Sequence, residues 1–325
     1  MKKHRSLIIF SVILIFFLIF LAIISQGITF SQTQPQIRKI SFLAGGKKGE
    51  TWSKMEQGIT QAASDYKVEL TPVYLSKEND AQEQIQMLER EVENGADAIV
   101  IAPVNSEDLE EPIRKASRSI PVITIDSEIA GADDIPYIRC DNIALGETLS
   151  EQMLNDPAKT GKPIALVNRS LSRTSCAQRY QGAKSKLQEE NVSFVEWPLP
   201  EDSTEAYSQL LTLLRGSSVS KVAAFDSDTS ELVAKAEQEL SPSGVTSVQI
   251  FGVGSTRQVV SYLEDHVISA LSVQNEFNIG YLGLQKAVNI LNGQSLQNTV
   301  IDYSIVTGED LYTKENQRLL FPFSQ

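Results

Sequence analysis

The chain has 325 residues, of which 42% are hydrophobic and 22% are charged. These values are ordinary for a globular protein, and the length predicts about two domains at roughly 100–200 residues each. The formal net charge is −12. An acidic surface repels phosphate backbones, so nucleic acid is excluded as an expected partner.

The N-terminus carries a basic cluster over residues 2–5, followed by 18 residues from Leu7 to Ile24 in which only Ser11 is polar. At about 1.5 Å per residue this run nearly spans a bilayer core of about 30 Å. The basic cluster places the N-terminus in the cytoplasm and the remainder of the chain outside.

We therefore predict a cytoplasmic tail over residues 1–6, a membrane anchor or signal over 7–27, and a polar tether over 28–36. An uncleaved anchor and a cleaved signal both remain open. The tripeptide Ser25-Gln26-Gly27 matches a cleavage site poorly, and a secretory apolar stretch is usually shorter than this one.

From residue 37 onward, apolar runs of strand length alternate with amphipathic stretches of helix length. In chain order, strands are expected at 37–44, 68–75, 96–103, 121–126, 135–140, 163–168, 193–197, 221–226, 247–254, 268–274 and 300–306. Helices are expected at 51–66, 80–94, 106–118, 143–155, 176–189, 204–214, 230–240, 256–265 and 277–291. Runs such as Ala98–Ala102 are apolar on both faces, as buried parallel strands are.

This alternation predicts an α/β fold with doubly wound parallel sheets and right-handed crossovers. About ten such units are too many for one compact sheet of the usual size. The pattern breaks near Cys140-Asp141-Asn142, so two lobes are expected. We place the first lobe at 37–140 plus 275–301 and the second at 141–274 plus 302–325.

Ligands of open α/β sheets bind beyond the carboxyl ends of the strands. The residues that follow the predicted strands are polar and include one tryptophan. They lie at 45–52, 103–106, 126–127, 141–142, 168–174, 226–228, 254–255 and 274–275. Carboxylates and amides can form paired hydrogen bonds with vicinal hydroxyl groups, and Trp52 can cover the apolar face of a sugar.

From Ile37 to about Thr313, the order and content of these segments resemble the periplasmic sugar-binding proteins of the ribose/galactose type. The apolar N-terminal segment suggests a membrane-anchored form of this family. The matching segments are Asn94–Pro103, Ile120–Asp126, Cys140–Asn142, Arg179 with Gly182, Val248–Gly254 and Ser272–Gln274. The resemblance implies a type I periplasmic binding protein fold, whose lobes are joined by a hinge of three chain crossings near residues 140–142, 274 and 302–303.

The resemblance also assigns Trp52, Asp126, Asn142 and Gln274 to the ligand. This chain departs from the family at three positions. Ser127 follows Asp126 where the family often has an arginine, and Ala177 lies near the position of a second pocket arginine. Gly254 stands where the family usually has an aspartate. Arg173 can replace a missing arginine, and Asp226 or Asp228 a missing carboxylate. The expected ligand-binding residues are Trp52, Asp126, Ser127, Asn142, Arg173, Ser227, Asp228 and Gln274.

Five of these residues have a structural alternative. Trp52 can be a core residue on a helix face, and Asp126 can form a turn at a strand end. Asn142 can be a helix N-cap. Gln274 can be a hydrogen-bonding residue of the hinge only, and Arg173 can be a solvated charge on a loop.

No metal, cofactor or catalytic site is predicted. The run Gly45–Gly49 lacks the spacing of a phosphate loop. Cys140, Cys176 and His266, the one histidine of the body, do not readily supply a zinc site. Export permits a disulfide between the two cysteines, and two separate thiols are the alternative. Nothing places His266 beside a nucleophile, so we expect no enzyme.

The resemblance implies an extracytoplasmic solute-binding protein at the outer face of the cytoplasmic membrane. It would close on a small polar ligand, a sugar or sugar-like molecule, and present it to the permease of an ABC importer. The alternative is a sensory co-receptor that signals to the ectodomain of a histidine kinase. The N-terminal membrane segment excludes a DNA-binding repressor.

Overall fold

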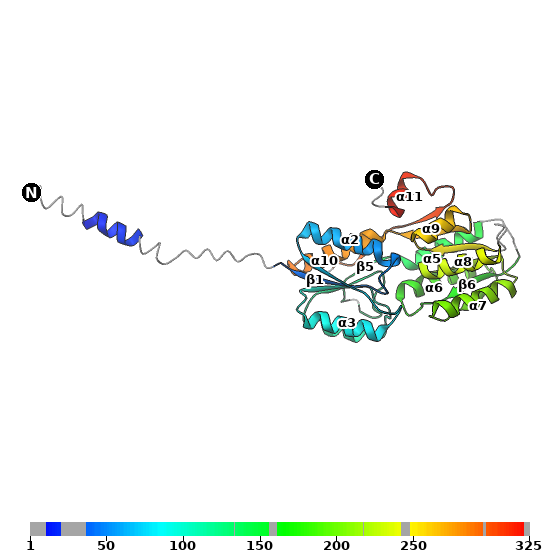
Figure 1. The fold of residues 1–325 in the computed structure, drawn as a ribbon, viewed down its shortest axis with the longest axis horizontal. Coiled ribbons are helices and arrows are strands. Elements are labelled where there is room, and N and C mark those ends of the chain that lie inside the picture. Colours follow the sequence, from blue (N-terminus) through cyan, green and yellow to red (C-terminus); the bar gives the residue numbers. More distant parts are fainter. Residues whose placement is uncertain are drawn as a thin grey trace, which may run out of the picture. The chain divides into compact units, whose positions relative to one another are not determined.

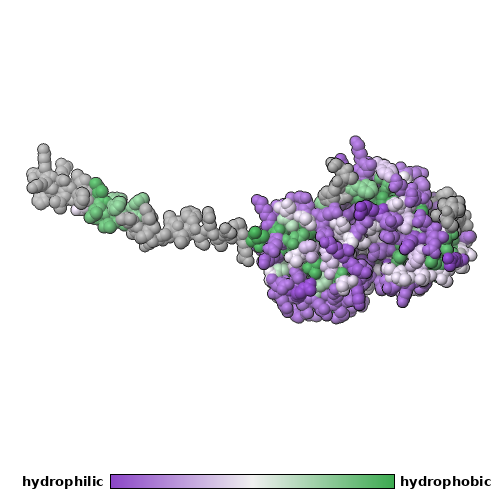
Figure 2. Space-filling model, viewed as in Figure 1, coloured by the Kyte–Doolittle hydropathy of each residue, from purple (hydrophilic) through white to green (hydrophobic). Residues whose placement is uncertain are grey.

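The computed structural model describes residues 11–20, 37–132, 134–155, 161–216, 218–241, 248–294 and 297–321. The chain divides into an N-terminal unit, Met1–Ile37, and a body, Arg38–Gln325. In the N-terminal unit, residues 11–20 form a helix with exposed apolar side chains, coloured hydrophobic in Figure 2.

Within the described ranges, no helix is both long enough and apolar enough to cross a membrane. The predicted tail over 1–6, the rest of the predicted segment 7–27 and the tether 28–36 lie outside the described residues. The face of the body that Figure 2 shows is mainly hydrophilic.

One half of the body is a six-stranded parallel sheet, sheet A, with helices on both faces (Figure 1). Its spatial order is β11 (Thr299–Ile301), β5 (Tyr137–Cys140), β4 (Val122–Ile125), β3 (Ala98–Ile101), β1 (Lys39–Leu43) and β2 (Glu69–Val73). The covering helices are α2 (Glu50–Tyr66) and α10 (Glu276–Leu291) on one face, and α3 (Ala81–Glu93) and α4 (Glu110–Ser117) on the other. Val100 packs toward α2 and α10, whereas its neighbours Ile99 and Ile101 pack toward α3 and α4, so β3 is apolar on both faces. Sheet A and these four helices are called lobe A.

The other half is a second six-stranded sheet, sheet B. Its spatial order is β12 (Tyr303–Thr307), β10 (Ile268–Gln274), β9 (Gln249–Val253), β8 (Lys221–Ala223), β6 (Ile164–Asn168) and β7 (Phe194–Pro198). The covering helices are α5 (Asn142–Asn155) and α6 (Thr174–Glu189) on one face, and α7 (Ser203–Gly216), α8 (Ser227–Leu240) and α9 (Arg257–Glu264) on the other. Sheet B and these helices are called lobe B. Its edge strand β12 runs antiparallel to β10, whereas the prediction was a wholly parallel sheet.

The chain passes between the two sheets three times, after β5, after β10 and between β11 and β12. The prediction of a single strand over 300–306 is wrong, because Asp302 lies between two strands that belong to different sheets. The apolar pattern continues across Asp302 without a turn residue, so periodicity alone could not reveal the change of sheet.

Two helical predictions also need correction. The helix expected from residue 106 begins only at Glu110, because the side chain of Asn105 accepts hydrogen bonds from the backbone N–H groups of Glu107 and Asp108 and forms a turn. The short C-terminal helix α11 (Lys314–Leu320) was not predicted. Its N-cap is Thr313, whose side chain accepts a hydrogen bond from Asn316 N, and seven residues are too few to show a clear period.

Candidate functional site

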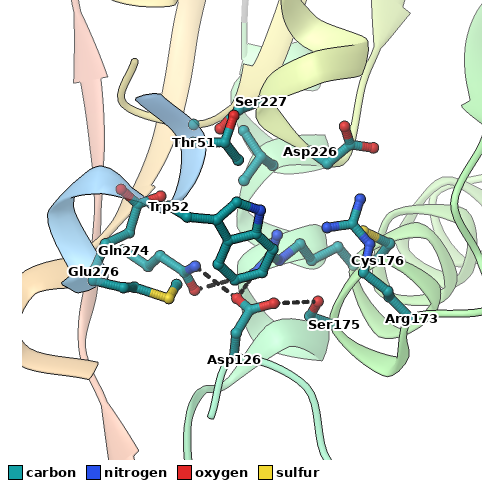
Figure 3. Close-up of a pocket in the computed structure, with 14 residues that line it drawn as sticks. Thr51, Trp52, Asp126, Arg173, Ser175, Cys176, Asp226, Ser227, Gln274 and Glu276 are labelled. Atoms are coloured by element: carbon teal, nitrogen blue, oxygen red, sulfur yellow. Dashed lines mark hydrogen bonds and ion pairs between the residues drawn. The ribbon is translucent and has the colours of Figure 1, made fainter. Parts of the chain in front are cut away.

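A cavity of about 30 Å³ lies between lobe A and lobe B, at the carboxyl ends of their parallel strands (Figure 3). Its wall combines side chains of both lobes and of the chain crossing that leads from β10 to α10. The lining residues are Thr51, Trp52, Met55, Asp126, Arg173, Ser175, Cys176, Arg179, Asp226, Ser227, Val253, Gly254, Gln274 and Glu276.

Trp52 supplies the aromatic surface of this wall. It lies in the first turn of α2, is 4% exposed, and belongs both to the core of lobe A and to the cavity lining. Gly45, just after β1, makes room for it, because a Cβ there would lie 2.7 Å from two ring carbons of the indole. Trp52 is therefore both a core residue and part of the cavity wall, so the two interpretations of it are compatible.

Asp126 joins the two lobes at the centre of the site. It follows β4 with φ +63°, a left-handed conformation that Asp tolerates better than most residues. Its Oδ2 accepts a hydrogen bond from Ser175 Oγ at 3.0 Å, and its Oδ1 accepts one from Gln274 Nε2 at 2.9 Å. One guanidinium nitrogen of Arg179 lies 3.5 Å from the same Oδ1. One carboxylate of lobe A is thus held by three side chains of lobe B.

Arg179 organises the lobe B side of this cluster. Its Nε donates to Asn142 Oδ1 at 2.8 Å, and its two terminal nitrogens donate to Phe225 O at 3.2 Å and to Gln274 Oε1 at 3.0 Å. Each guanidinium nitrogen therefore has a protein partner. Sequence reasoning noted Arg179 only as part of a family pattern and did not place it at the site.

Three predicted ligand-binding residues do not line the cavity. Ser127 is buried and its hydroxyl lies 2.9 Å from Ser175 Oγ. Asn142 is fully buried against Arg179, and the N-cap alternative for it is also wrong, because Asp141 Oδ1 accepts the hydrogen bond of Ala144 N. These side chains point at neighbouring protein groups, a direction that sequence position cannot reveal.

The third is Asp228, whose Oδ1 accepts a hydrogen bond from Thr51 Oγ1 of lobe A at 3.0 Å. Burial, together with repulsion from Asp226, raises the pKa of Asp228. Asp228 therefore acts as a contact between the lobes, beside the cavity wall rather than in it.

The N-terminus of α8 provides the part of the wall around Asp226 and Ser227. Asp226 is the N-cap of α8, and its carboxylate accepts hydrogen bonds from Thr229 N at 2.9 Å and Thr229 Oγ1 at 2.8 Å. Gly254 faces this turn with φ +139°, and a Cβ there would lie 2.3 Å from Ser227 Oγ. An aspartate at 254, which the resemblance would place there, is sterically excluded.

Arg173 is the second arginine of the wall. It precedes α6 as its N-cap residue and is 8% exposed, so the alternative of a solvated loop charge is wrong. Burial opposes its charge, but interactions with Cys176, Asp226 and Asp228 outweigh burial and raise the pKa of Arg173. Its buried Nε has no hydrogen-bond partner among the described residues.

Glu276 closes the wall on the α10 side. Its Oε2 accepts a hydrogen bond from Ser255 Oγ at 2.8 Å, and Lys54 Nζ donates to the carbonyl oxygen of Ser255 at 2.6 Å. Burial raises the pKa of Glu276, while attraction from Lys54 opposes the shift. Sequence reasoning missed Glu276 because an acidic residue in the first turn of a helix is usually explained by its favourable interaction with the helix dipole.

Of the eight predicted residues, Trp52, Asp126, Arg173, Ser227 and Gln274 line the cavity. The lining residues outside that set are Thr51, Met55, Ser175, Cys176, Arg179, Asp226, Val253, Gly254 and Glu276. Several of these lie in the first turns of helices that begin at the strand ends. That position is the signal that could have found them.

Both cysteines are free and buried, so the disulfide alternative is wrong. Burial raises the pKa of each thiol to about 11. Cys176 lines the cavity, whereas Cys140, the last residue of β5, is buried where it packs against the core of lobe B. Among the residues that the structure describes, no cluster of three or more His, Cys, Asp or Glu could hold a metal ion.

Comparisons with known proteins find similarity along most of the body. Residues 40–295 match the periplasmic binding protein domain. The ribose import binding protein of Bacillus subtilis (strain 168) is 23% identical over 251 residues, covering 76% of this chain and 79% of that protein.

Two solved structures share the fold. A carbohydrate transporter solute binding protein from Agrobacterium radiobacter, in complex with D-arabinose, has a TM-score of 0.81 and 20% identity, covering 88% of this chain and 99% of its own. A structure described as the XylFII-LytSN complex has a TM-score of 0.76 and 18% identity, covering 85% of this chain and 100% of its own.

The raised pKa of Glu276 predicts a pH-dependent effect on stability. The folded protein keeps the carboxyl proton at pH values where the unfolded chain has lost it. Ionisation of this group therefore lowers the free energy of unfolding as the pH rises above about 4.5. Gln at this position can still accept the Ser255 hydrogen bond, so Glu276→Gln should gain stability relative to the natural protein between pH 4.5 and 7.5.

Urea unfolding at several pH values measures this difference. The exposed Glu107 provides the control, because Glu107→Gln should leave the pH dependence of unfolding unchanged. A difference between Glu276→Gln and the natural protein that stays constant with pH would contradict the assignment.

Proposed function

Because the chain belongs to the periplasmic binding protein family, we propose that it is an extracytoplasmic solute-binding protein. Its lobes close on a sugar or sugar-like molecule and present it to the permease of an ABC importer. Family membership confirms the expectation of a binding protein rather than an enzyme. The observation that carries the proposal is the cavity between the lobes, whose polar wall draws on both of them.

The relatives support a sugar as the ligand. The Bacillus subtilis relative is named for ribose import, and the Agrobacterium structure contains D-arabinose. The cavity wall offers the groups that such a ligand needs. The indole of Trp52 can cover an apolar ring face, while Asp126, Gln274, Ser227 and Arg173 can exchange hydrogen bonds with ring and hydroxyl oxygens.

We assign the other three predicted residues an indirect role. Ser127 positions Ser175, Asn142 positions Arg179, and Asp228 holds Thr51. Each of these partners lines the cavity.

Entry of a sugar requires the lobes to separate. A cavity of about 30 Å³ holds only one or two water molecules, whereas pockets for small ligands occupy roughly 300–1,000 Å³. The three chain crossings provide a hinge about which the lobes can rotate. Direct hydrogen bonds that link the lobes include Thr174 Oγ1 to Glu128 O at 2.7 Å and Ser172 Oγ to Val104 O at 3.1 Å. Each such bond contributes about 0.5–1.5 kcal/mol, because water replaces it on opening.

A sensory role is the second candidate. One structural neighbour is a complex of XylFII with LytSN, so a solved structure of this fold contains a second named component. We therefore retain a histidine kinase ectodomain as the alternative partner. We also propose that the apolar run from Leu7 to Ile24 anchors the body at the outer face of the membrane, where the chain stays close to either partner.

Removal of the protein from cells separates the two roles. If it is an importer component, cells that lack it should lose uptake of the labelled ligand. If it is a sensor, transcription that responds to the ligand should be lost while uptake by an already expressed importer continues. Measuring uptake and transcript levels in the same cells decides between them.

Tryptophan fluorescence tests the proposed contact with Trp52. The chain has only two tryptophans, and Trp197 lies in the core of lobe B. In Trp197→Phe, Trp52 is the sole reporter, and ribose or arabinose should change its emission in a saturable way. In the matched variant Trp52→Phe, Trp197 should not respond. A response of Trp197 alone would refute the contact.

Cys176 reports on opening of the lobes. Because it lines the cavity and is 1% exposed, alkylation should require opening, and a bound ligand should slow it at least about tenfold. The rate should rise about tenfold per pH unit below the thiol pKa of about 11, because only the thiolate reacts. Iodoacetamide labelling followed by mass spectrometry measures both effects. Cys140 in the core provides an internal control, and equal labelling of Cys176 with and without ligand would contradict closure over this cavity.

A further inference from the structure

Arg173 has a different hydrogen-bonding environment from Arg179, the other arginine that lines the cavity. Its side chain is 8% exposed, and among the described residues it makes no hydrogen bond and no ion pair. A guanidinium carries five N–H donors in a rigid plane and cannot lose its charge in a protein. Nearby carboxylates offset the cost of burying this charge, but its buried Nε has no hydrogen-bond partner among the described residues, so a hydrogen-bond acceptor is expected to come from outside the chain.

Arg179 shows what a satisfied arginine looks like in the same wall. Its three nitrogens donate to Asn142, Phe225 O and Gln274, and it also lies 3.5 Å from Asp126. Arg179 has no need of an external acceptor. Arg173 comes six residues earlier, at the start of the same helix.

The acidic groups of the wall are turned toward other donors. Asp126 accepts from Ser175 and Gln274, and Asp226 accepts twice from Thr229. Asp226 and Asp228 attract Arg173 electrostatically, but no carboxylate oxygen of the described residues lies within 4.0 Å of its nitrogens.

The cavity wall also contains Ser227 and the thiol of Cys176, and Cys176 interacts electrostatically with Arg173. A sugar hydroxyl accepts hydrogen bonds but must also place its own proton. A carboxylate offers about four lone pairs and no proton, and its plane matches the two parallel N–H bonds of a guanidinium.

We propose that the ligand is a sugar acid, whose carboxylate pairs with Arg173 while its hydroxyl groups face the carboxylates of Asp126 and Asp226. This inference rests on the proposed function, since it names the class of ligand for the same cavity. The sugar hydroxyls donate to the wall's carboxylates, and Arg173 neutralises the added charge. A neutral sugar would leave some N–H groups of the Arg173 guanidinium without hydrogen-bond acceptors.

Calorimetric titration of the full chain with matched ligand pairs tests the proposal. The pairs are glucose with glucuronate, galactose with galacturonate, and ribose with ribonate, and glucose 6-phosphate provides a phosphate-bearing comparison. At least one acid should bind at least about 30-fold more tightly than its neutral partner, the minimum expected for a buried charge pair. Preference for the phosphate over every carboxylate would overturn the assignment of a sugar acid.

Substitution of Arg173 provides the second arm. Arg173→Gln should weaken binding of the acid at least about 30-fold more than it weakens binding of the neutral partner, whereas Arg173→Lys should retain part of the preference. The exposed Arg118 provides the control through Arg118→Gln. Thermal unfolding establishes that each variant is folded, and the lysine variant keeps the test available if the glutamine variant does not fold.

The possible failures are distinguishable. Tight binding of a neutral sugar with no preference for its acid would overturn the sugar-acid inference and leave the proposed function standing. Absence of binding by every neutral and acidic sugar would overturn both. An acid preference that survives Arg173→Gln would show that Arg173 does not hold the carboxylate.

Discussion

The carboxylate of Asp126 is the point at which the two lobes are held together around the cavity. It belongs to lobe A, yet three of its side-chain partners, Ser175, Gln274 and Arg179, belong to lobe B. Arg179 is in turn fixed by Asn142. Movement of one lobe relative to the other must therefore break a connected set of buried hydrogen bonds at the centre of the site, and such sets are more cooperative than isolated pairs.

This arrangement makes the protein's own side chains competitors of the ligand. A ligand that hydrogen-bonds to Asp126 or Gln274 replaces contacts that already stabilise the closed lobes. It shifts the population toward closure only to the extent that its contacts to both lobes exceed those it displaces. Stacking on Trp52 adds such free energy without displacing a hydrogen bond. Pairing with Arg173 does the same, because its buried Nε has no hydrogen-bond partner within the described residues.

The lobes and the strand edges could be predicted from sequence because each rests on a local rule. Runs such as Ala98–Ala102 are apolar on both faces, and the polar residues after them meet at one edge of a parallel sheet. The direction of a side chain depends on partners far away in the chain, which no local pattern contains. Asn142 was therefore expected to face the ligand although it faces Arg179, and Glu276 was overlooked because its partners Ser255 and Lys54 come from both lobes.

Departures from the family pattern acquire a physical reason in the folded chain. Gly254 cannot carry a side chain, because α8 brings Ser227 against it, and Asp226 provides the carboxylate of that part of the wall instead. Ser127 lacks the charge that the pattern places after Asp126, and Arg173 brings a guanidinium to the cavity from lobe B. The cavity wall thus contains one aromatic side chain, one amide, carboxylates and arginines, but its charged side chains occupy other positions than in the family pattern. Since hydrogen-bonding geometry selects the ligand, a wall with relocated charges favours a guest whose own charges are arranged differently from those of a simple pentose.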